Sequence, residues 1–282
     1  MIKVLKPGLF SAVQDLGRFG YQDLGVPYSG VMDMKAAKIA NVLLNNSEDS
    51  AVLEMTMTGP TLHFNTHTII CLTGADISAK LNSKALSNYE LIKVQPNDIL
   101  SFGALRKGFR CYLAIMGGFK TEICMQSRSM YTGVTSNNRL LKGDHLEVEE
   151  KHVMLSDKNA GLKIDTTYMD SPIVDVFRGP EFHLLSKEQQ KELLNNDFSI
   201  SNYNNRMAYQ LNELLDNNLS PIITSPVLPG TVQLTPSGKI IILMRDCQTT
   251  GGYPRIFQLT AQAINSIAQK RTGQNITFSL FK

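Results

Sequence analysis

Apolar residues along this chain gather in short runs that are separated by turn-forming residues. Runs of this length, bounded by Gly, Pro, Asn and Ser, predict β-strands. The clearest are 51–57, 68–73, 109–116, 173–177, 231–235 and 239–244. Pro236-Ser237-Gly238 separates the last two runs and predicts a compact hairpin. Strands at this spacing are typical of barrels or sandwiches, so we predict a mainly β fold.

Three segments break this pattern and predict helices, and they are 33–46, 186–196 and 260–270. The first and third carry apolar residues at helical spacing. Asp33 stands at the start of the first as a candidate N-cap. In the second, Ser186 and Gln189 form a capping-box pattern. We expect these few short helices to cover or plug the barrels.

The length of 282 residues suggests about two domains, at roughly 150 residues per domain. Apolar density falls across 156–167, where small polar residues become frequent. We therefore predict a first unit over 1–160, with an N-terminal glycine-rich loop, and a second unit over 161–282. A turn followed by an alternating strand recurs near 96, 142 and 272. This recurrence fits either a duplicated barrel unit or a turn type common to many strands.

Charge and cysteine content narrow the class of partner. Lys and Arg number 28 and Asp and Glu 25, so the formal net charge is +3. Without a basic run, this balance argues against a nucleic-acid partner. There is no run of roughly 18 apolar residues and no apolar signal segment at the N-terminus, so we expect no membrane association. Four scattered cysteines suit buried thiols in a reducing, cytoplasmic compartment.

Several familiar catalytic motifs are missing. The sequence has no G-x-x-x-x-G-K-[ST] phosphate-binding loop, no G-x-S-x-G nucleophile elbow and no H-E-x-x-H zinc motif. Of five histidines, only His63 and His67 lie close together, and their spacing on a strand and turn does not make a metal site. We therefore predict no bound metal.

A first polar block, residues 13–33, contains four glycines. Ordering so flexible a loop costs entropy, so something must hold it in place. In this block Asp15 supplies a carboxylate, Arg18 a guanidinium, and Gln14 and Ser29 neutral polar groups. The block is either a long structural loop or part of a site. For Asp33 we favour the role of helix cap, and for Gln14 and Asp15 a functional role.

A second polar block, residues 245–255, directly follows the apolar run 239–244. Successive small residues allow backbone N–H groups to converge on an anion in a nest, and Arg255 is suited to bidentate binding of a carboxylate or phosphate. The alternative is a wide surface loop. The substrate-binding residues predicted from both blocks are Ser29, Gln248, Thr249, Thr250, Gly251, Gly252, Tyr253 and Arg255.

Two further arginines stand where charged residues are sparse. Arg128 lies in Gln126-Ser127-Arg128-Ser129, and Arg206 precedes a predicted strand. Each is either a solvated surface charge or an oxyanion-binding group. We predict Gln14, Asp15, Arg128 and Arg206 as catalytic residues, and expect them to converge with the second block on one pocket.

These blocks resemble those of a known family over nearly the whole chain. The stretches that carry the resemblance are Lys6-Pro7-Gly8, Val13-Gln14-Asp15-Leu16-Gly17-Arg18, Leu24-Gly25-Val26-Pro27, Ser29-Gly30, Met32-Asp33, Leu53-Glu54, Gly59-Pro60-Thr61-Leu62, Leu113-Ala114, Gly117-Gly118, Ser127-Arg128-Ser129, Arg206-Met207 and Gln248-Thr249-Thr250-Gly251-Gly252-Tyr253-Pro254-Arg255. The sequence is similar to the family of the 5-oxoprolinase C subunit, also called KipA-like or allophanate hydrolase subunit 2-like. That family is in turn similar to the biotin-dependent carboxyltransferase domain of urea carboxylase.

The resemblance implies two cyclophilin-like β-barrel units. It also implies a complex with two further subunits, one KipI-like and one LamB/YcsF-like, and together the three open 5-oxoproline to glutamate with ATP. On this basis we expect the chain to be inactive alone, with ATP bound here or on a partner. Family members commonly have Gly where this chain has Gln126 and Ala208, and Val where it has Leu228.

Two other functions stay open. One is a carboxyltransferase that acts with carboxybiotin on a urea-like amide. Because the chain has no Ala-Met-Lys-Met motif, there is no biotin attachment site, and biotin would arrive on a separate carrier. The other is a non-enzymatic binding partner of a sensor-kinase inhibitor.

Overall fold

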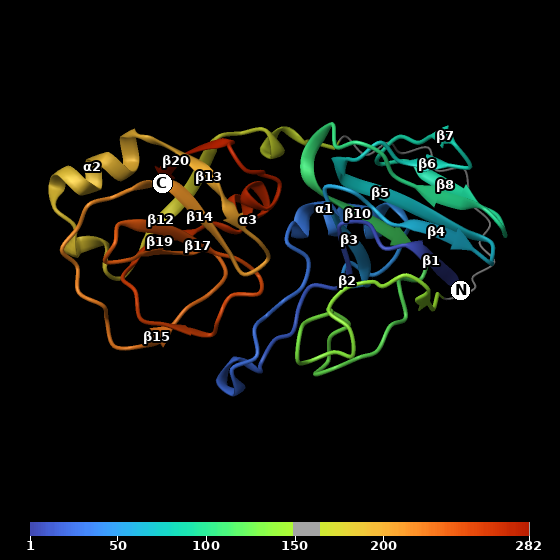
Figure 1. Ribbon diagram of the computed structural model, residues 1–282, viewed down its shortest axis with the longest axis horizontal. Coiled ribbons are helices and arrows are strands. Elements are labelled where there is room, and N and C mark those ends of the chain that lie inside the picture. The colour runs from blue at the N-terminus through green and yellow to red at the C-terminus, as the bar shows by residue number, and fades with distance from the viewer. Residues whose placement is uncertain (149–163, 282) are drawn as a thin grey trace. The chain divides into compact units, whose positions relative to one another are not determined.

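The computed structural model describes residues 1–148 and 164–281, which divide into two compact units (Figure 1). The first comprises Met1–Gly17 and Asp33–Tyr168, and the second comprises Arg18–Met32 and Met169–Lys282. The boundary that the sequence predicts, between 160 and 161, lies outside the described residues. We expected the whole glycine-rich loop in the first unit. Most of it, Arg18–Met32, belongs instead to the second unit.

The first unit contains two antiparallel sheets. The five-stranded sheet has the order β2 (Phe10–Gln14), β3 (Val52–Thr56), β10 (Lys107–Ile115), β5 (Thr68–Asp76) and β8 (Leu91–Val94). The six-stranded sheet has the order β11 (His145–Leu146), β1 (Ile2–Lys6), β4 (Thr61–Phe64), β9 (Ile99–Ser101), β6 (Lys80–Leu81) and β7 (Lys84–Ala85). Alternate residues of both sheets share one apolar core.

A single helix, α1 (Met34–Leu43), packs on β5 and β10 in the described part of the first unit. It begins where the sequence predicts, because the Asp33 carboxylate accepts a hydrogen bond from the Ala36 N–H at 3.0 Å. Core residues Leu53 and Leu113 point to the opposite face of the five-stranded sheet. The α1 side of that sheet therefore displays the other residues of each strand, and several of these are polar.

The second unit is a closed seven-stranded barrel. Its order is β12 (Ile173–Arg178), β19 (Arg255–Leu259), β16 (Thr231–Leu234), β17 (Lys239–Leu243), β14 (Ala208–Leu214), β13 (Asp197–Asn204) and β20 (Asn275–Leu280). Closure comes from the parallel pairing of β12 with β20, whereas the other neighbours are antiparallel. Aromatic rings fill the interior, with centroid separations of 5.1 Å for Phe182–Phe257 and 5.2 Å for Phe257–Phe278. The predicted mainly β fold is confirmed.

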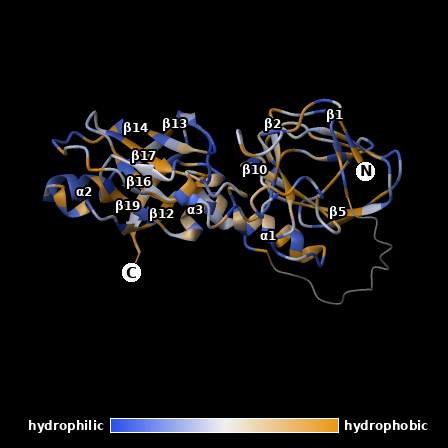
Figure 2. Cartoon of the chain, turned by 90° about the horizontal axis from the view of Figure 1, so that it is seen from below, coloured by the Kyte–Doolittle hydropathy of each residue, from blue (hydrophilic) through white to orange (hydrophobic). Residues whose placement is uncertain are grey.

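Two helices and a ribbon complete the second unit. Helix α2 (Lys187–Asn195) begins with the predicted capping box, in which both reciprocal bonds of Ser186 and Gln189 are present. Hydrophilic residues dominate α2, and of its side chains Leu193 is buried (Figure 2). Helix α3 (Ala261–Ala268) packs on β12 and β19 and is capped by Thr260. Strands β15 (Ser225–Pro226) and β18 (Thr250–Gly251) form the ribbon.

Short 3₁₀ turns connect several of these elements: η1 (Gln22–Leu24), η2 (Thr167–Met169) and η3 (Phe182–Leu184). The predicted hairpin at Pro236-Ser237-Gly238 joins β16 to β17 and pairs Leu234 with Ile240. Within 1–148 and 164–281, every helix falls short of the length and apolar content needed to cross a membrane.

Candidate functional site

Asp15 organises a polar cluster at the end of β2. Its Oδ1 accepts hydrogen bonds from the Ser127 hydroxyl at 2.7 Å, the Ser129 hydroxyl at 2.6 Å and the Gly17 N–H at 2.9 Å. Its Oδ2 accepts from the Arg128 N–H at 2.6 Å. Both carboxylate oxygens are thus hydrogen-bonded, Oδ1 by three donors and Oδ2 by one. The contacts thus join the first polar block to the Ser-Arg-Ser element, more than a hundred residues away.

The Ser-Arg-Ser element follows a tight turn. Cys124 and Ser127 bond to each other through both backbone groups, and the two residues between them, Met125 and Gln126, have φ of 51° and 60°. Positive φ at both central positions is the geometry of a type I′ turn, which favours Gly. Glycine, which the resemblance implies at position 126, would adopt this backbone without the strain that Gln126 carries. The side chain of Arg128 donates to the carbonyl oxygen of Thr121.

Gln14 is fully buried in β2 and donates from Nε2 to the carbonyl oxygen of Met130 at 3.0 Å. The Met130 N–H in turn donates to the carbonyl oxygen of Val13 at 3.0 Å. Gln14 and Asp15 thus both contact the segment that contains Arg128, and the catalytic role of the three stays a prediction.

The α1 side of the five-stranded sheet carries a buried hydrogen-bonded network that the sequence did not predict. The Tyr112 hydroxyl donates to Glu54 Oε2 at 2.9 Å and accepts from the Asp33 N–H at 2.8 Å. Asp33 Oδ2 accepts from the Tyr168 hydroxyl at 2.7 Å. Arg110 Nε lies 3.8 Å from Glu54 Oε1, and both side chains are at most 2% exposed. Asp33 is thus a helix cap, as predicted, and also a link in this network.

The network holds its tyrosines as neutral phenols. Burial, followed by the nearby Glu54 carboxylate, raises the pKa of Tyr112 well above its usual value. Burial and the adjacent Asp33 also raise the pKa of Tyr168. The signal that could have revealed this network is a charged or phenolic residue alternating with core residues in an apolar strand, as at Glu54, Arg110 and Tyr112.

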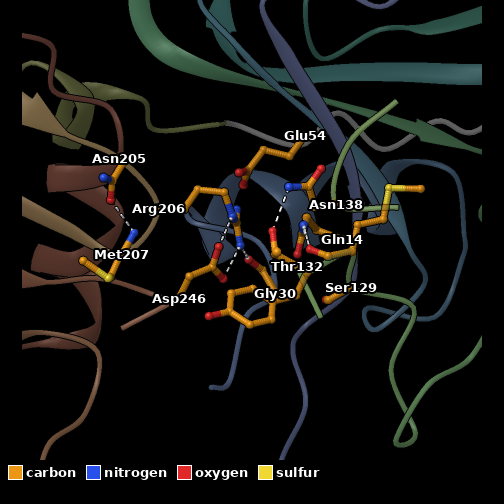
Figure 3. Close-up of polar contacts among 12 residues, drawn as sticks. Gln14, Gly30, Glu54, Ser129, Thr132, Asn138, Asn205, Arg206, Met207 and Asp246 are labelled. Carbon is orange, nitrogen blue, oxygen red and sulfur yellow. Dashed lines mark hydrogen bonds and ion pairs between the residues drawn. The ribbon is translucent and has the colours of Figure 1, made fainter. Parts of the chain in front are cut away.

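In the second unit, Arg206 is a bidentate partner of Asp246. Its Nε donates to Oδ2 at 2.8 Å, and its Nη2 donates to Oδ1 at 3.1 Å and to the carbonyl oxygen of Gly30 at 2.6 Å (Figure 3). Both side chains are nearly buried, at 8% and 12% exposure. The guanidinium therefore binds a carboxylate of its own chain and fixes the end of the first polar block.

Ser29 lies beside that contact and is fully buried. Its N–H donates to the carbonyl oxygen of Arg245 at 2.9 Å, which brings the loop Arg18–Met32 against the start of the second polar block. Its backbone is left-handed, with φ of 54°, and its hydroxyl has no hydrogen-bond partner among the described residues.

The second polar block, residues 245–255, contains a short strand and does not form the predicted anion nest. Thr250 and Gly251 form β18, which pairs with β15, and the Gly252 carbonyl oxygen accepts from the Ile222 N–H at 2.9 Å. All of residues 245–255 are described and none has positive φ, so the alternating backbone of an anion nest is absent and that prediction is wrong. A Cβ on Gly251 would lie 2.5 Å from Nε2 of Gln233, so this glycine serves a close approach of side chains.

The other predicted members of this block make intrachain contacts. The Thr249 carbonyl oxygen accepts from the Val227 N–H at 3.1 Å, Gln248 Nε2 lies 3.5 Å from Oε1 of Gln233, and the Tyr253 carbonyl oxygen lies 3.4 Å from Nε2 of the same glutamine. Tyr253 is 41% exposed. It is therefore a member of this block that a partner or ligand can reach in this conformation.

Arg255 binds a carboxylate, and that carboxylate is Glu181. Arg255 Nε and Nη2 donate to Oε2 and Oε1 at 3.0 and 2.9 Å, and its backbone N–H adds a third bond at 2.9 Å. These hydrogen bonds from Arg255 lower the pKa of Glu181. The bidentate geometry expected from the sequence is present, with a residue of the same unit as the partner.

The structure also places the thiols and the side chains that could ligate a metal. Burial raises the pKa of Cys71 and of Cys247 to about 12, so both stay thiols at neutral pH. Residues 1–148 and 164–281 contain no group of three His, Cys, Asp or Glu side chains that could hold a metal ion.

The mainly β fold of two units is the fold of a carboxyltransferase domain, since the family model and a solved urea carboxylase both match nearly the whole chain. The chain belongs to the family described as carboxyltransferase domain, subdomain A and B, which matches residues 24–280. The convergence of all predicted site residues on one pocket stays a prediction.

Particular relatives narrow this class. The chain is 32% identical over 284 residues to the C subunit of 5-oxoprolinase from Escherichia coli (strain K12), and the match covers 99% of this chain and 90% of that protein. It is 36% identical over 159 residues to urea amidolyase of Lachancea kluyveri, which covers 55% of this chain and 9% of that protein. The crystal structure of Kluyveromyces lactis urea carboxylase matches all of this chain at a TM-score of 0.88 and 27% identity, and the match spans 27% of that enzyme.

Proposed function

We propose that this chain is the C subunit of an ATP-dependent 5-oxoprolinase, a cytoplasmic hetero-oligomer that opens 5-oxoproline to glutamate. The observation that carries the proposal is the relationship to the 5-oxoprolinase C subunit of E. coli, which extends over 99% of this chain and 90% of that protein. A match of this extent leaves no large part of the relative without a counterpart. The proposed partners are two other subunits, one KipI-like and one LamB/YcsF-like.

The chemistry of the proposed reaction explains the need for ATP. A lactam is resonance-stabilised, so water attacks it slowly. Transfer of the γ-phosphoryl group to the lactam oxygen, with release of ADP, makes the ring carbon electrophilic. Addition of one water there, followed by protonation of the ring nitrogen and cleavage of the C–N bond, opens the ring to an acyl phosphate. A second water displaces phosphate from this acyl phosphate and gives glutamate. Such a site needs hydrogen-bond donors for the substrate carboxylate and for the developing oxyanion.

The chain offers neutral donors of this kind. Ser29 has a buried hydroxyl without a partner among the described residues, and Tyr253 is partly exposed. Arg206 and Arg255 are each paired with a carboxylate of their own unit. We therefore propose that the arginines shape the loops and that hydroxyl and backbone groups contact the substrate.

The test is reconstitution. The three proteins are purified separately and combined, and glutamate release from 5-oxoproline is followed together with ADP formation. We expect both products only when this chain, both partner homologues and ATP are all present. Equal rates with and without this chain would refute the proposal. Titration of ATP into the isolated chain, by calorimetry, reports whether the nucleotide binds here or on a partner.

A second candidate is carboxyl transfer from carboxybiotin to a urea-like amide. The similarity to urea amidolyase and the match to K. lactis urea amidolyase, at a TM-score of 0.88 over 100% of this chain and 19% of that one, favour it. Incorporation of labelled bicarbonate into urea, in the presence of a biotin carboxylase and a biotinylated carrier, measures it. Incorporation that avidin abolishes would support this second function.

A further inference from the structure

Ser29 and Gly30 adopt an unusual backbone. Ser29 has φ of 54° and Gly30 has φ of 81°, so two successive residues are left-handed. Glycine adopts this conformation freely, whereas a serine is strained by contact between its Cβ and the backbone. Strain of this kind persists only where surrounding structure enforces it, and it gathers at functional sites.

The surrounding structure does enforce it. Ser29 is held through its N–H by the carbonyl oxygen of Arg245 at 2.9 Å, and Gly30 is held through its carbonyl oxygen by Arg206 Nη2 at 2.6 Å. Two hydrogen bonds to Asp246 orient that guanidinium, and the Asp246 N–H donates back to the Arg206 carbonyl oxygen at 2.9 Å. The pair is nearly buried, so few alternative rotamers compete with this arrangement.

The side chain at the centre of this arrangement is the one left without a partner. The Ser29 hydroxyl is buried and accepts or donates no hydrogen bond among the described residues. By contrast, Ser127 and Ser129, the other serines of the candidate site, both donate to Asp15. A buried hydroxyl without a partner is destabilising, so its retention calls for a partner that arrives from outside the chain.

We infer that Arg206 and Asp246 are a positioning pair, which holds the left-handed Ser29–Gly30 backbone so that the Ser29 hydroxyl donates a hydrogen bond to a carboxylate or carbonyl oxygen of the amide substrate. This inference rests on the proposed function and assigns roles within it. Arg206 acts through Ser29 and does not itself touch the substrate. Because the hydrogen bond forms with bound substrate and persists in the transition state, its loss weakens binding more than turnover.

The test uses the reconstituted three-protein complex and the variant Ser29→Gly. Glycine accepts the left-handed backbone, so this variant removes the hydroxyl without adding strain. We expect KM for 5-oxoproline to rise about tenfold, as for loss of one hydrogen bond, with kcat within about twofold of the wild type. Thermal stability of the isolated chain should be equal or higher. The matched control is Ser83→Gly, because Ser83 is exposed and also left-handed, with φ of 71°.

A double-mutant cycle tests the positioning role. Arg206→Lys keeps the charge and loses the bidentate geometry, so it should also raise KM. In the Ser29→Gly background the same change should raise KM much less, because the group being positioned is already gone. An unchanged KM in Ser29→Gly, or fully additive effects, would overturn the inference while leaving the proposed function intact. A wild-type complex without turnover would overturn both.

Discussion

Replacing Asp15 by Asn should destabilise the first unit by about 2 to 5 kcal/mol. In the structure Oδ1 accepts three hydrogen bonds and Oδ2 accepts one from the Arg128 N–H at 2.6 Å. With the amide oxygen retained at Oδ1, its NH₂ group faces the Arg128 N–H, so that donor loses its partner at a cost of about 1–3 kcal/mol. The three bonds to Oδ1 lose their charge, and together they weaken by roughly another 1–2 kcal/mol in this half-buried setting.

Urea unfolding followed by far-UV circular dichroism measures the change, since the chain contains no Trp for fluorescence. Hydrogen exchange of the Gly17 and Arg128 amides should accelerate in the variant, because both donate to this carboxylate. Amides of the barrel in the second unit serve as the internal reference. Asp23→Asn is the matched control: Asp23 is exposed in η1, and its replacement should change stability by less than about 0.5 kcal/mol.

One result would refute this reasoning. If Asp15→Asn kept the stability and amide protection of the wild type yet abolished glutamate release in the complex, the carboxylate would act chemically and not as a scaffold. That outcome would favour the catalytic role that the sequence predicts for Asp15.

Three other changes test backbone strain, close packing and the ion pair of the second block. Gln126→Gly should stabilise by about 1 kcal/mol, because its φ of 60° strains any side chain, and Gln126→Ala should show no such gain in the same urea titration. Gly179→Ala should cost about 3 kcal/mol, since its Cβ would lie 2.1 Å from the Arg255 carbonyl oxygen, whereas Gly252→Ala meets nothing nearer than 3.5 Å and should be nearly neutral by thermal unfolding. Because Arg255 lowers the pKa of Glu181, the ionised pair stabilises the fold above about pH 4.3 and this contribution is lost as pH falls through the lower folded pKa. The stability gap between the wild type and Glu181→Gln should therefore narrow from pH 7 to pH 3, and a gap independent of pH would contradict the assignment.

Local elements of the fold could be predicted because their signals are adjacent in sequence. The Asp33 cap, the capping box of Ser186 and Gln189 and the β16–β17 hairpin each depend on residues within a few positions of one another. In each case a side chain or turn satisfies backbone groups of its own segment. The structure of the glycine-rich second block could not be predicted in this way, because glycine permits both an anion nest and close packing. The close approach of the Gln233 side chain to Gly251 shows that close packing is its role here.

The candidate site illustrates the opposite case. The sequence singled out Asp15 and Arg206 as polar groups in unusual surroundings, and both do lie at the centre of hydrogen-bonded clusters. It did not reveal their partners, because Gly30 and Arg206 are 176 positions apart and Asp15 and Ser127 are 112 apart. Nor did it reveal the Glu54–Tyr112 link, which depends on the register between β3 and β10.

The sequence by itself determined the three helices, the strands β3, β5, β10, β12, β16 and β17, and the family. Periodicity, caps and motifs depend on residues that are close together in the chain. Only the tertiary structure decided that Arg18–Met32 joins the second unit, that Asp15 and the arginines at 206 and 255 are already paired, and that the Ser29 hydroxyl has no partner among the described residues. The physical reason is that the role of a polar side chain depends on the group to which it is hydrogen-bonded or ion-paired. Those partners come from distant parts of the sequence and are set by packing.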